Sequence, residues 1–226
     1  MTPPQPKPLY SLLTDTAAAH EGSIAMHYLG RDFTYSMTDH TSSRFATALA
    51  SLGVKRGDRV AIFLPNIPQF VFAFFGILKA GGIVVNNNPL YKERELAHQL
   101  NDSGAEVIVA SMDVVKGNDL YASLEGCRAS TSLRHIICTS TTDYLPGFKR
   151  RLARLAGIRR VRRVNTLDFV NLVRTSPSAT EFADVDPIRD VAVLQYTGGT
   201  TGVSKGPCSR TTTCTQMRSS SPDTSR

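Results

Sequence analysis

Long hydrophobic runs are missing from this sequence. No apolar stretch reaches the 18 residues that a transmembrane helix needs. The longest one, residues 70–78, is typical of a helix buried between layers of a globular fold. The first eight residues, MTPPQPKP, lack the apolar core of a signal peptide and predict a disordered arm over 1–8. These absences favour a cytoplasmic protein, and no transmembrane helix is expected.

Cysteine is scarce, and its spacing fits no metal site. The sequence has four cysteines, at Cys127, Cys138, Cys208 and Cys214. The last two lie in a polar segment without a nearby histidine, so no zinc-type ligand set is present. We therefore predict reduced thiols and assign no metal ligand from the sequence.

Acidic residues are absent between Tyr144 and Leu167, and this gap explains the basic balance of the chain. Eight arginines and lysines lie in the gap, and without them the net charge of +7 would become −1. Because the rest of the chain is close to neutral, the composition does not indicate a nucleic-acid-binding surface. The basic charge belongs to one segment and not to the whole protein.

The basic segment, 148–164, has the pattern of an amphipathic helix. Phe148, Leu152, Leu155 and Ile158 recur at spacings of four, three and three, and arginines fill the positions between them. Two interpretations stay open: a solvated surface helix between subdomains, or a peripheral contact with an anionic membrane. Nucleic-acid binding is less favoured, because no aromatic platform accompanies the charges.

Strand-like and helix-like segments alternate between residues 58 and 139, which predicts a parallel α/β architecture. A hairpin is predicted over 24–35, followed by a helix to about Leu52 that Ser36 would cap. Predicted strands cover 58–64, 83–85, 106–110, 135–139 and 190–195. Predicted helices cover 9–19, 69–80, 92–101 and 113–124, and 167–173 is predicted as a short helix or strand.

The strongest motif is residues 196–206, YTGGTTGVSKG, directly after the apolar strand at 190–195. Its glycines allow the backbone N–H groups to turn toward one point and to form an anion-binding nest. Hydroxyls and one lysine add hydrogen-bond donors and positive charge, and the loop contains no acidic residue. The predicted ligand is a polyphosphate, and the predicted binding residues are Thr197, Gly198, Gly199, Thr200, Thr201, Gly202, Ser204, Lys205 and Gly206.

This loop differs from two better-known phosphate-binding motifs. The Walker pattern needs adjacent Gly, Lys and Ser or Thr, whereas Val203 and Ser204 here separate Gly202 from Lys205. The eleven residues instead closely resemble the AMP-binding signature of the adenylate-forming superfamily, which contains acyl-CoA synthetases, luciferases and peptide-synthetase adenylation domains. The resemblance implies that the loop holds the β and γ phosphates of ATP while a carboxylate attacks the α phosphorus.

A second block narrows the resemblance. Residues 87–91, NNPLY, and 94–105, RELAHQLNDSGA, look like the long-chain fatty acid branch of the acyl-CoA synthetases. From the residues themselves, this block is expected to shape a helix and its cap and not to touch substrate. The resemblance implies the leading part of the family's large domain, with layered parallel sheets and helices, over 9–206. It also implies ATP with Mg²⁺, CoA and a fatty acid as ligands, and no nucleic acid.

The resemblance stops after Gly206. Residues 207–226 contain ten serines and threonines and no Val, Ile, Leu or Phe, so a disordered or frame-shifted tail is predicted. We therefore expect a fragment of an ATP-dependent fatty acid–CoA ligase that carries the phosphate-binding loop. The alternative is a non-catalytic remnant that binds at most phosphate or an anionic membrane. No residue is assigned as catalytic acid, base or nucleophile, and enzymatic activity of the chain by itself stays open.

Overall fold

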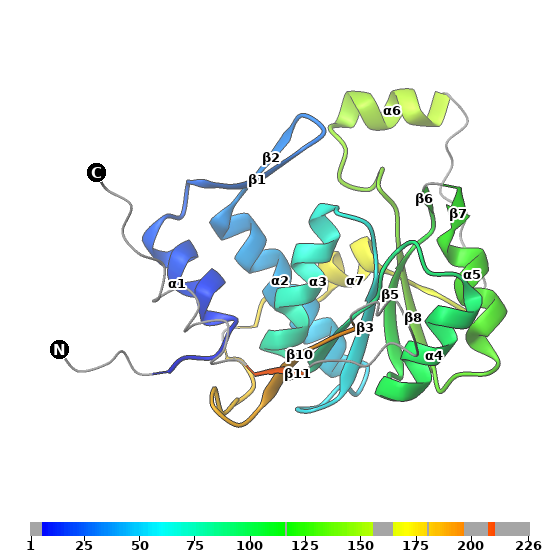
Figure 1. Cartoon of the computed structure of the whole chain (residues 1–226). Helices are drawn as coiled ribbons and strands as arrows, with labels where there is room; N and C mark the ends of the chain where they lie inside the picture. The colour runs from blue at the N-terminus through cyan, green and yellow to red at the C-terminus, as the bar shows by residue number, and fades with distance from the viewer. Residues whose placement is uncertain (1–5, 116, 156–164, 180, 197–207, 211–226) are drawn as a thin grey trace, which may run out of the picture.

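The computed structural model describes residues 6–115, 117–155, 165–179, 181–196 and 208–210. Its centre is a seven-stranded sheet in the order β11-β10-β4-β3-β5-β8-β9 (Figure 1). The strands are β3 (Arg59–Phe63), β4 (Ile83–Asn86), β5 (Val107–Ser111), β8 (His135–Thr139), β9 (Leu167–Asp168), β10 (Val191–Gln195) and β11 (Cys208–Arg210). All neighbouring strands run parallel except β10 and β11, which are antiparallel. The predicted parallel α/β architecture is confirmed.

Helices cover both faces of the sheet, as Figure 1 shows for α2 and α3 on one side and α4 and α5 on the other. The helices are α1 (Ser11–Ala19), α2 (Tyr35–Ser51), α3 (Pro68–Lys79), α4 (Glu93–Ser103), α5 (Leu120–Arg128), α6 (Gly147–Leu155) and α7 (Phe169–Thr175). Among the described residues, none of these helices is long and apolar enough to cross a membrane.

Strand β3 shows why the core has two halves. Its side chains alternate, so that Val60 and Ile62 join the cluster under α2, α3 and α7, while Ala61 and Phe63 join the cluster under α4 and α5. A strand covered on both faces must be apolar on both, which explains the nearly continuous hydrophobic run from Val60 to Leu64.

Helices α2 and α3 pack closely against each other on one face of the sheet. A Cβ atom added at Gly76 would lie 2.7 Å from Cδ1 of Phe45 and 3.0 Å from the carbonyl oxygen of Ser42. Glycine at this position therefore lets the two helices approach closely. Phe45 also packs on Phe169 of α7, with ring centroids 4.7 Å apart, and so joins three helices.

The start of α2 corrects one expectation. Its N-cap is Thr34, whose hydroxyl accepts a hydrogen bond from the backbone N–H of Met37 at 3.1 Å. Ser36, the predicted cap, already lies inside the helix. The preceding hairpin of β1 (Ile24–Tyr28) and β2 (Arg31–Thr34) is confirmed and ends where the cap begins.

The helix predicted over 113–124 is wrong in its first half. Residues there form a small hairpin of β6 (Val114–Val115) and β7 (Asn118–Asp119), with Gly117 at a positive φ of 78°. The Asp119 side chain then caps α5 by accepting from the N–H of Ala122 at 3.0 Å. A local side-chain cap thus decided where the helix begins.

Two further segments were predicted only in part. Residues 167–173, left open between helix and strand, contain both β9 and the start of α7. Within the tail over 207–226, predicted to be disordered or frame-shifted, Cys208–Arg210 form β11 and pair with β10. An edge strand offers free backbone groups, so this pairing requires no apolar side chains. Residues 207 and 211–226 and the arm over 1–5 lie outside the described residues.

Candidate functional site

The strand order reverses beside β3. The chain passes from β3 through α3 to β4 on one side, and then from β4 through α4 to β5 on the other side. The loops that leave β3 and β4 therefore turn to opposite faces of the sheet. In doubly wound α/β folds the crevice between two such loops, at the carboxyl ends of the strands, is the usual ligand site.

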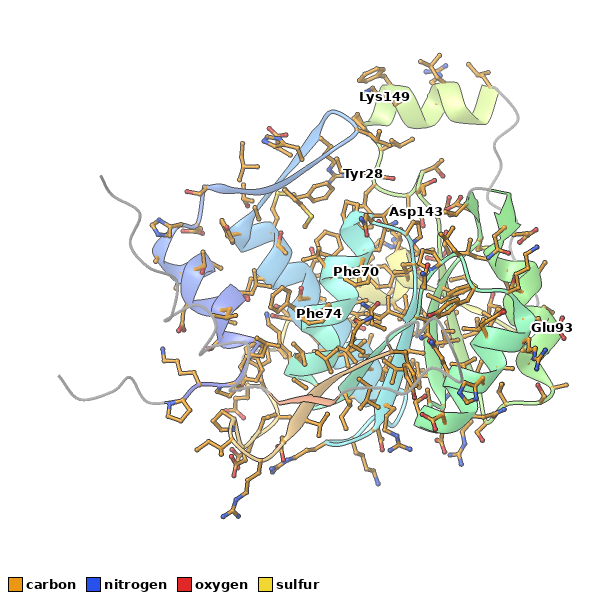
Figure 2. All side chains as sticks on the ribbon, viewed as in Figure 1. Tyr28, Phe70, Phe74, Glu93, Asp143 and Lys149 are labelled. Atoms are coloured by element: carbon orange, nitrogen blue, oxygen red, sulfur yellow. The ribbon has the colours of Figure 1, made fainter. Side chains whose placement is uncertain are left out.

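A cavity of about 440 Å³ lies at this point. Its walls come from the carboxyl ends of three neighbouring strands and from the loops that follow them. The lining residues are Leu64, Asn66, Phe70, Asn86, Asn87, Asn88, Pro89, Tyr91, Gln195 and Tyr196. We call this cavity the switch-point pocket. Figure 2 labels one wall residue, Phe70, on α3.

Two amide side chains hold the ends of β4 and β10 together at the rim of the switch-point pocket. Asn86 donates from Nδ2 to Oε1 of Gln195 at 2.9 Å, and the same two residues are register partners in the parallel pair. Each occupies the last position of its strand and follows apolar strand residues. This contact aligns the position at which the chain leaves β10.

Tyr196, the next residue, is anchored to the opposite layer. Its ring is buried in the cluster under α4 and α5, and its hydroxyl donates to Oδ2 of Asp102 at 2.6 Å. Burial, and then the hydrogen bond to Asp102, raises the pKa of the Tyr196 phenol above its ordinary value. The side chain is therefore a neutral hydrogen-bond donor at physiological pH.

Asn87 adds a buried polar group to the wall of the switch-point pocket. Its Nδ2 donates to the carbonyl oxygen of Val85 at 3.0 Å, and its backbone N–H donates to that of Ile62 at 3.0 Å. Within the described part of the chain, its Oδ1 atom is buried and has no hydrogen-bond partner. Unsatisfied buried oxygens are uncommon in native proteins, so this atom is a candidate acceptor for a donor in the site.

The lining of the switch-point pocket suits a polar organic ligand and not a metal ion. It contains amides, two phenols and apolar side chains, but no carboxylate, thiol or imidazole. Over the described ranges as a whole, no group of three or more His, Cys, Asp or Glu could hold a metal. Cys127 is one of the two cysteines whose side chains are described as buried, and burial raises the pKa of its thiol to about 11, which keeps it protonated.

All nine residues predicted to bind phosphate, Thr197–Gly206 without Val203, lie outside the described residues. The structure describes what precedes and follows them. Tyr196 precedes the segment at the pocket wall, and Cys208 follows it, paired with Leu194 near the end of β10. Because β10 and β11 are antiparallel, the residues on both sides of the segment lie near the carboxyl end of β10, beside the switch-point pocket.

Sequence reasoning missed Asn86 and Gln195, and it assigned Asp102 only to helix shape. The available signal was positional: Asn86 and Gln195 are polar residues that directly follow apolar strand residues, where the carboxyl ends of parallel strands meet. The sequence does not show that β4 and β10 are neighbours, because they are more than a hundred residues apart. The role of Asp102 depends on the same distant pairing.

The fold and the switch-point pocket define a doubly wound α/β protein with a ligand site at the strand reversal. Residues 13–221 match the family of AMP-binding enzymes, and the chain belongs to that family. A "long-chain-fatty-acid–CoA ligase" of Bacillus subtilis (strain 168) is 37% identical over 206 residues, which cover 88% of this chain and 36% of the relative.

Solved structures agree on the fold. An anthranilate CoA ligase in complex with anthranoyl-AMP aligns with a TM-score of 0.77 at 23% identity, over 92% of this chain and 36% of its own. A long-chain-fatty-acid–CoA ligase from Archaeoglobus fulgidus aligns with a TM-score of 0.71 at 22% identity, over 92% and 37%. The chain thus spans little more than a third of the length of these relatives.

Proposed function

We propose that this chain is the part of an ATP-dependent long-chain fatty acid–CoA ligase that carries the phosphate-binding loop. The observation that carries the proposal is the position of the loop motif. Residues 197–206 directly follow Tyr196, which lines the wall of the switch-point pocket. The similarity to fatty acid–CoA ligases over most of the chain supports the same substrate class.

The proposed chemistry has two steps. A fatty acid carboxylate oxygen attacks the α phosphorus of ATP, which forms the acyl-adenylate and releases pyrophosphate. The sulfur of CoA then attacks the acyl carbon, loses its proton and displaces AMP, which leaves the acyl-CoA thioester. In the first step negative charge grows on the leaving pyrophosphate, so preorganised donors around it lower the barrier.

The loop residues have electrostatic roles in this proposal. Thr200 and Thr201 donate hydrogen bonds to phosphate oxygens, and the glycines let backbone N–H groups point at the same anion. Lys205 neutralises charge on the β and γ phosphates. The Asn86–Gln195 and Tyr196–Asp102 contacts fix the start of the loop, and a fixed start reduces the entropy lost when the loop closes on its ligand.

Magnesium belongs to the proposal as a companion of ATP. The lining of the switch-point pocket offers no carboxylate, so these residues do not supply its ligands. Phosphate oxygens and water are the ligands that Mg²⁺ commonly uses at nucleotide sites. Fatty acid, CoA, a cytoplasmic location and a peripheral contact between the basic segment 148–164 and an anionic membrane complete the proposal.

The test measures ATP and pyrophosphate binding by calorimetry on the purified 226-residue chain. Lys205→Ala should weaken binding by roughly tenfold or more, because a charge-assisted contact to phosphate is lost. Lys55→Ala is the matched control. Lys55 is an exposed lysine before the amino end of β3, whereas the pocket lies at the carboxyl ends of the strands. Equal binding by the Lys205→Ala chain, or no binding by any variant, contradicts the proposed loop role.

A second assay separates the ligase from the non-catalytic alternative. Fatty-acid-dependent exchange of labelled pyrophosphate into ATP requires adenylate formation and not merely phosphate binding. Exchange by the chain that is lost in Lys205→Ala supports ligase chemistry in these residues. Phosphate binding without exchange supports the remnant for the chain by itself.

A further inference from the structure

One wall of the switch-point pocket is held by a side chain from outside the pocket. Pro89 and Tyr91 line the pocket from the loop between β4 and α4, which we call the 87–91 loop. Asn118, the first residue of β7, donates from Nδ2 to the carbonyl oxygen of Pro89 at 3.1 Å and to that of Tyr91 at 2.8 Å. Asn118 does not itself line the pocket, and it is only 7% exposed. Its amide therefore serves the loop and not the solvent.

The partners of the Asn118 amide fix its orientation. A carbonyl oxygen can only accept a hydrogen bond, so the amide nitrogen must face the loop. On the other side, the hydroxyl of Ser123 in α5 donates to Oδ1 of Asn118 at 3.1 Å. Both N–H groups of one buried amide are thus spent on a single loop.

The loop has only part of its hydrogen bonding from within. Oδ1 of Asn88 accepts from the backbone N–H of Leu90 at 2.9 Å, and the carbonyl oxygen of Asn88 accepts from that of Tyr91 at 3.0 Å. These contacts satisfy N–H groups of the loop but none of its carbonyl oxygens after Asn88. Asn118 supplies a donor to two of those oxygens, so its removal would loosen the loop at both positions.

The β6–β7 hairpin gives Asn118 a fixed position. Asn118 is the register partner of Val115, and Gly117 turns the chain between them at a φ of 78°. The next residue, Asp119, caps α5. Figure 1 shows the hairpin at the upper end of α5. A donor held between a tight turn and a helix start can fix the loop before a ligand arrives, which lowers the entropy cost of binding.

Asn87, at the start of the loop, shows what kind of ligand group the wall would accept. Within the described part of the chain, its buried Oδ1 has no hydrogen-bond partner, and the residue lines the pocket. An unpaired acceptor calls for an N–H donor on the ligand. The organic parts of ATP and CoA carry N–H groups, whereas pyrophosphate carries none.

We propose that Asn118 is a positioning residue that holds the 87–91 loop as a wall of the switch-point pocket. In this arrangement the loop binds the N–H-bearing organic part of a substrate, and the phosphate groups are left to the loop at 197–206. The inference rests on the proposed function, because it takes ATP or CoA as the ligand of the pocket. Asn118 acts through the loop and does not touch the substrate.

The experiment measures the binding of ATP, CoA and pyrophosphate by calorimetry on the 226-residue chain and on Asn118→Asp. Aspartate has almost the same shape, but its carboxylate has no donor for the two carbonyl oxygens. The affinity for ATP, for CoA or for both should fall by about tenfold, because it falls with the fraction of molecules whose loop is in place. Pyrophosphate binding should stay unchanged, a split that a general loss of folding would not produce.

Two further variants control for the added charge. Asn118→Ala removes the donors without adding a charge and should reproduce the loss. Asn101→Asp is the matched control, since Asn101 donates from Nδ2 to the carbonyl oxygen of Ser130 at 3.0 Å and does not line the pocket. It should leave all three affinities unchanged. Hydrogen exchange should rise over the 87–91 loop in both Asn118 variants and stay unchanged in β3 and β5, which verifies that the core is folded.

The remaining outcomes separate this inference from the proposed function. If the wild-type chain binds none of the three ligands, the proposed function fails and the inference fails with it. If the wild-type chain binds pyrophosphate but neither ATP nor CoA, the role of the phosphate loop stands and the inference is overturned. Equal affinities in wild type and Asn118→Ala, or an equal loss for all three ligands, overturn the inference alone.

Discussion

At the scale of single residues, Tyr196 connects the end of β10 to the layer of helices α4 and α5. Its ring packs in the layer under α4 and α5, while its backbone continues from β10 into the segment that carries the phosphate motif. The hydrogen bond to Asp102 links this position to the carboxyl-terminal part of α4. Tyr196, which the sequence shows only as the first residue of the motif, therefore also anchors the end of β10 to α4.

Tyr196→Phe should lower the free energy of unfolding by about 1 kcal/mol, because one hydrogen bond is lost while the ring still fills its place. Urea denaturation of the two chains at neutral pH measures the difference. Asp102→Asn is the matched variant, since an amide oxygen still accepts the hydrogen bond. A loss from Asp102→Asn larger than that from Tyr196→Phe would contradict the assignment.

The same pair predicts a pH dependence. Because burial and the Asp102 contact raise the pKa of Tyr196 above 10.0, the phenol keeps its proton longer in the folded than in the unfolded chain. Its stabilising contribution is complete below pH 10 and is lost as pH rises further. The stability difference between wild type and Tyr196→Phe should therefore shrink above pH 10. A constant difference up to pH 11 would argue against the raised pKa.

At the scale of elements, the caps decided boundaries that hydrophobic spacing could not. The sequence predicts Ser36 as the cap of α2, whereas the observed cap, Thr34, lies two residues earlier. The hairpin settles the choice, because β2 ends at Thr34 in extended backbone and the helix starts at the next residue. The position of α5 depends in the same way on Asp119.

Thr34→Ala should cost about 1 kcal/mol of stability, because the N–H of Met37 loses its acceptor. Ser36→Ala is the internal control and should change stability by a few tenths at most, since Ser36 is already helical. Thermal or urea unfolding of the two variants decides between the caps. Equal losses, or a larger loss from Ser36→Ala, would restore the assignment made from sequence.

At the scale of the whole molecule, the strands differ in how completely they are covered. In β3, four of five residues are buried, and the strand pairs on both sides with parallel neighbours. In β10, only Ala192 is buried, and Gln195 is exposed, although the sequence predicts a buried strand there. The side of the sheet that holds β10 is thus less protected than its centre at β3.

Hydrogen exchange should follow this difference. The amides of β3 and β5 should exchange most slowly, and those of β10 measurably faster, because fewer buried contacts must break to open that side of the sheet. Exchange detected by mass spectrometry on peptides from each strand provides the measurement. Protection of β10 equal to that of β3 would show that the sheet opens as one unit.

The sequence by itself determined the fold class, most strands and helices, the hairpin and the family. These features depend on local patterns, namely apolar periodicity, turn residues and a motif of consecutive residues, which the chain order preserves. The confirmed boundaries of β8 are one example, and α3 begins at Pro68, one residue before the predicted helix over 69–80. Resemblance worked for the same reason, because a signature of adjacent residues needs no knowledge of distant neighbours.

Only the tertiary structure decided which distant residues meet. The Asn86–Gln195 contact, the Tyr196–Asp102 bond and the Lys149–Leu29 hydrogen bond each join residues that are about a hundred positions apart. Such pairs depend on strand order and layer packing, which many sequences with the same local patterns can satisfy differently. The switch-point pocket follows from this packing, because it is assembled from segments that the chain order keeps apart.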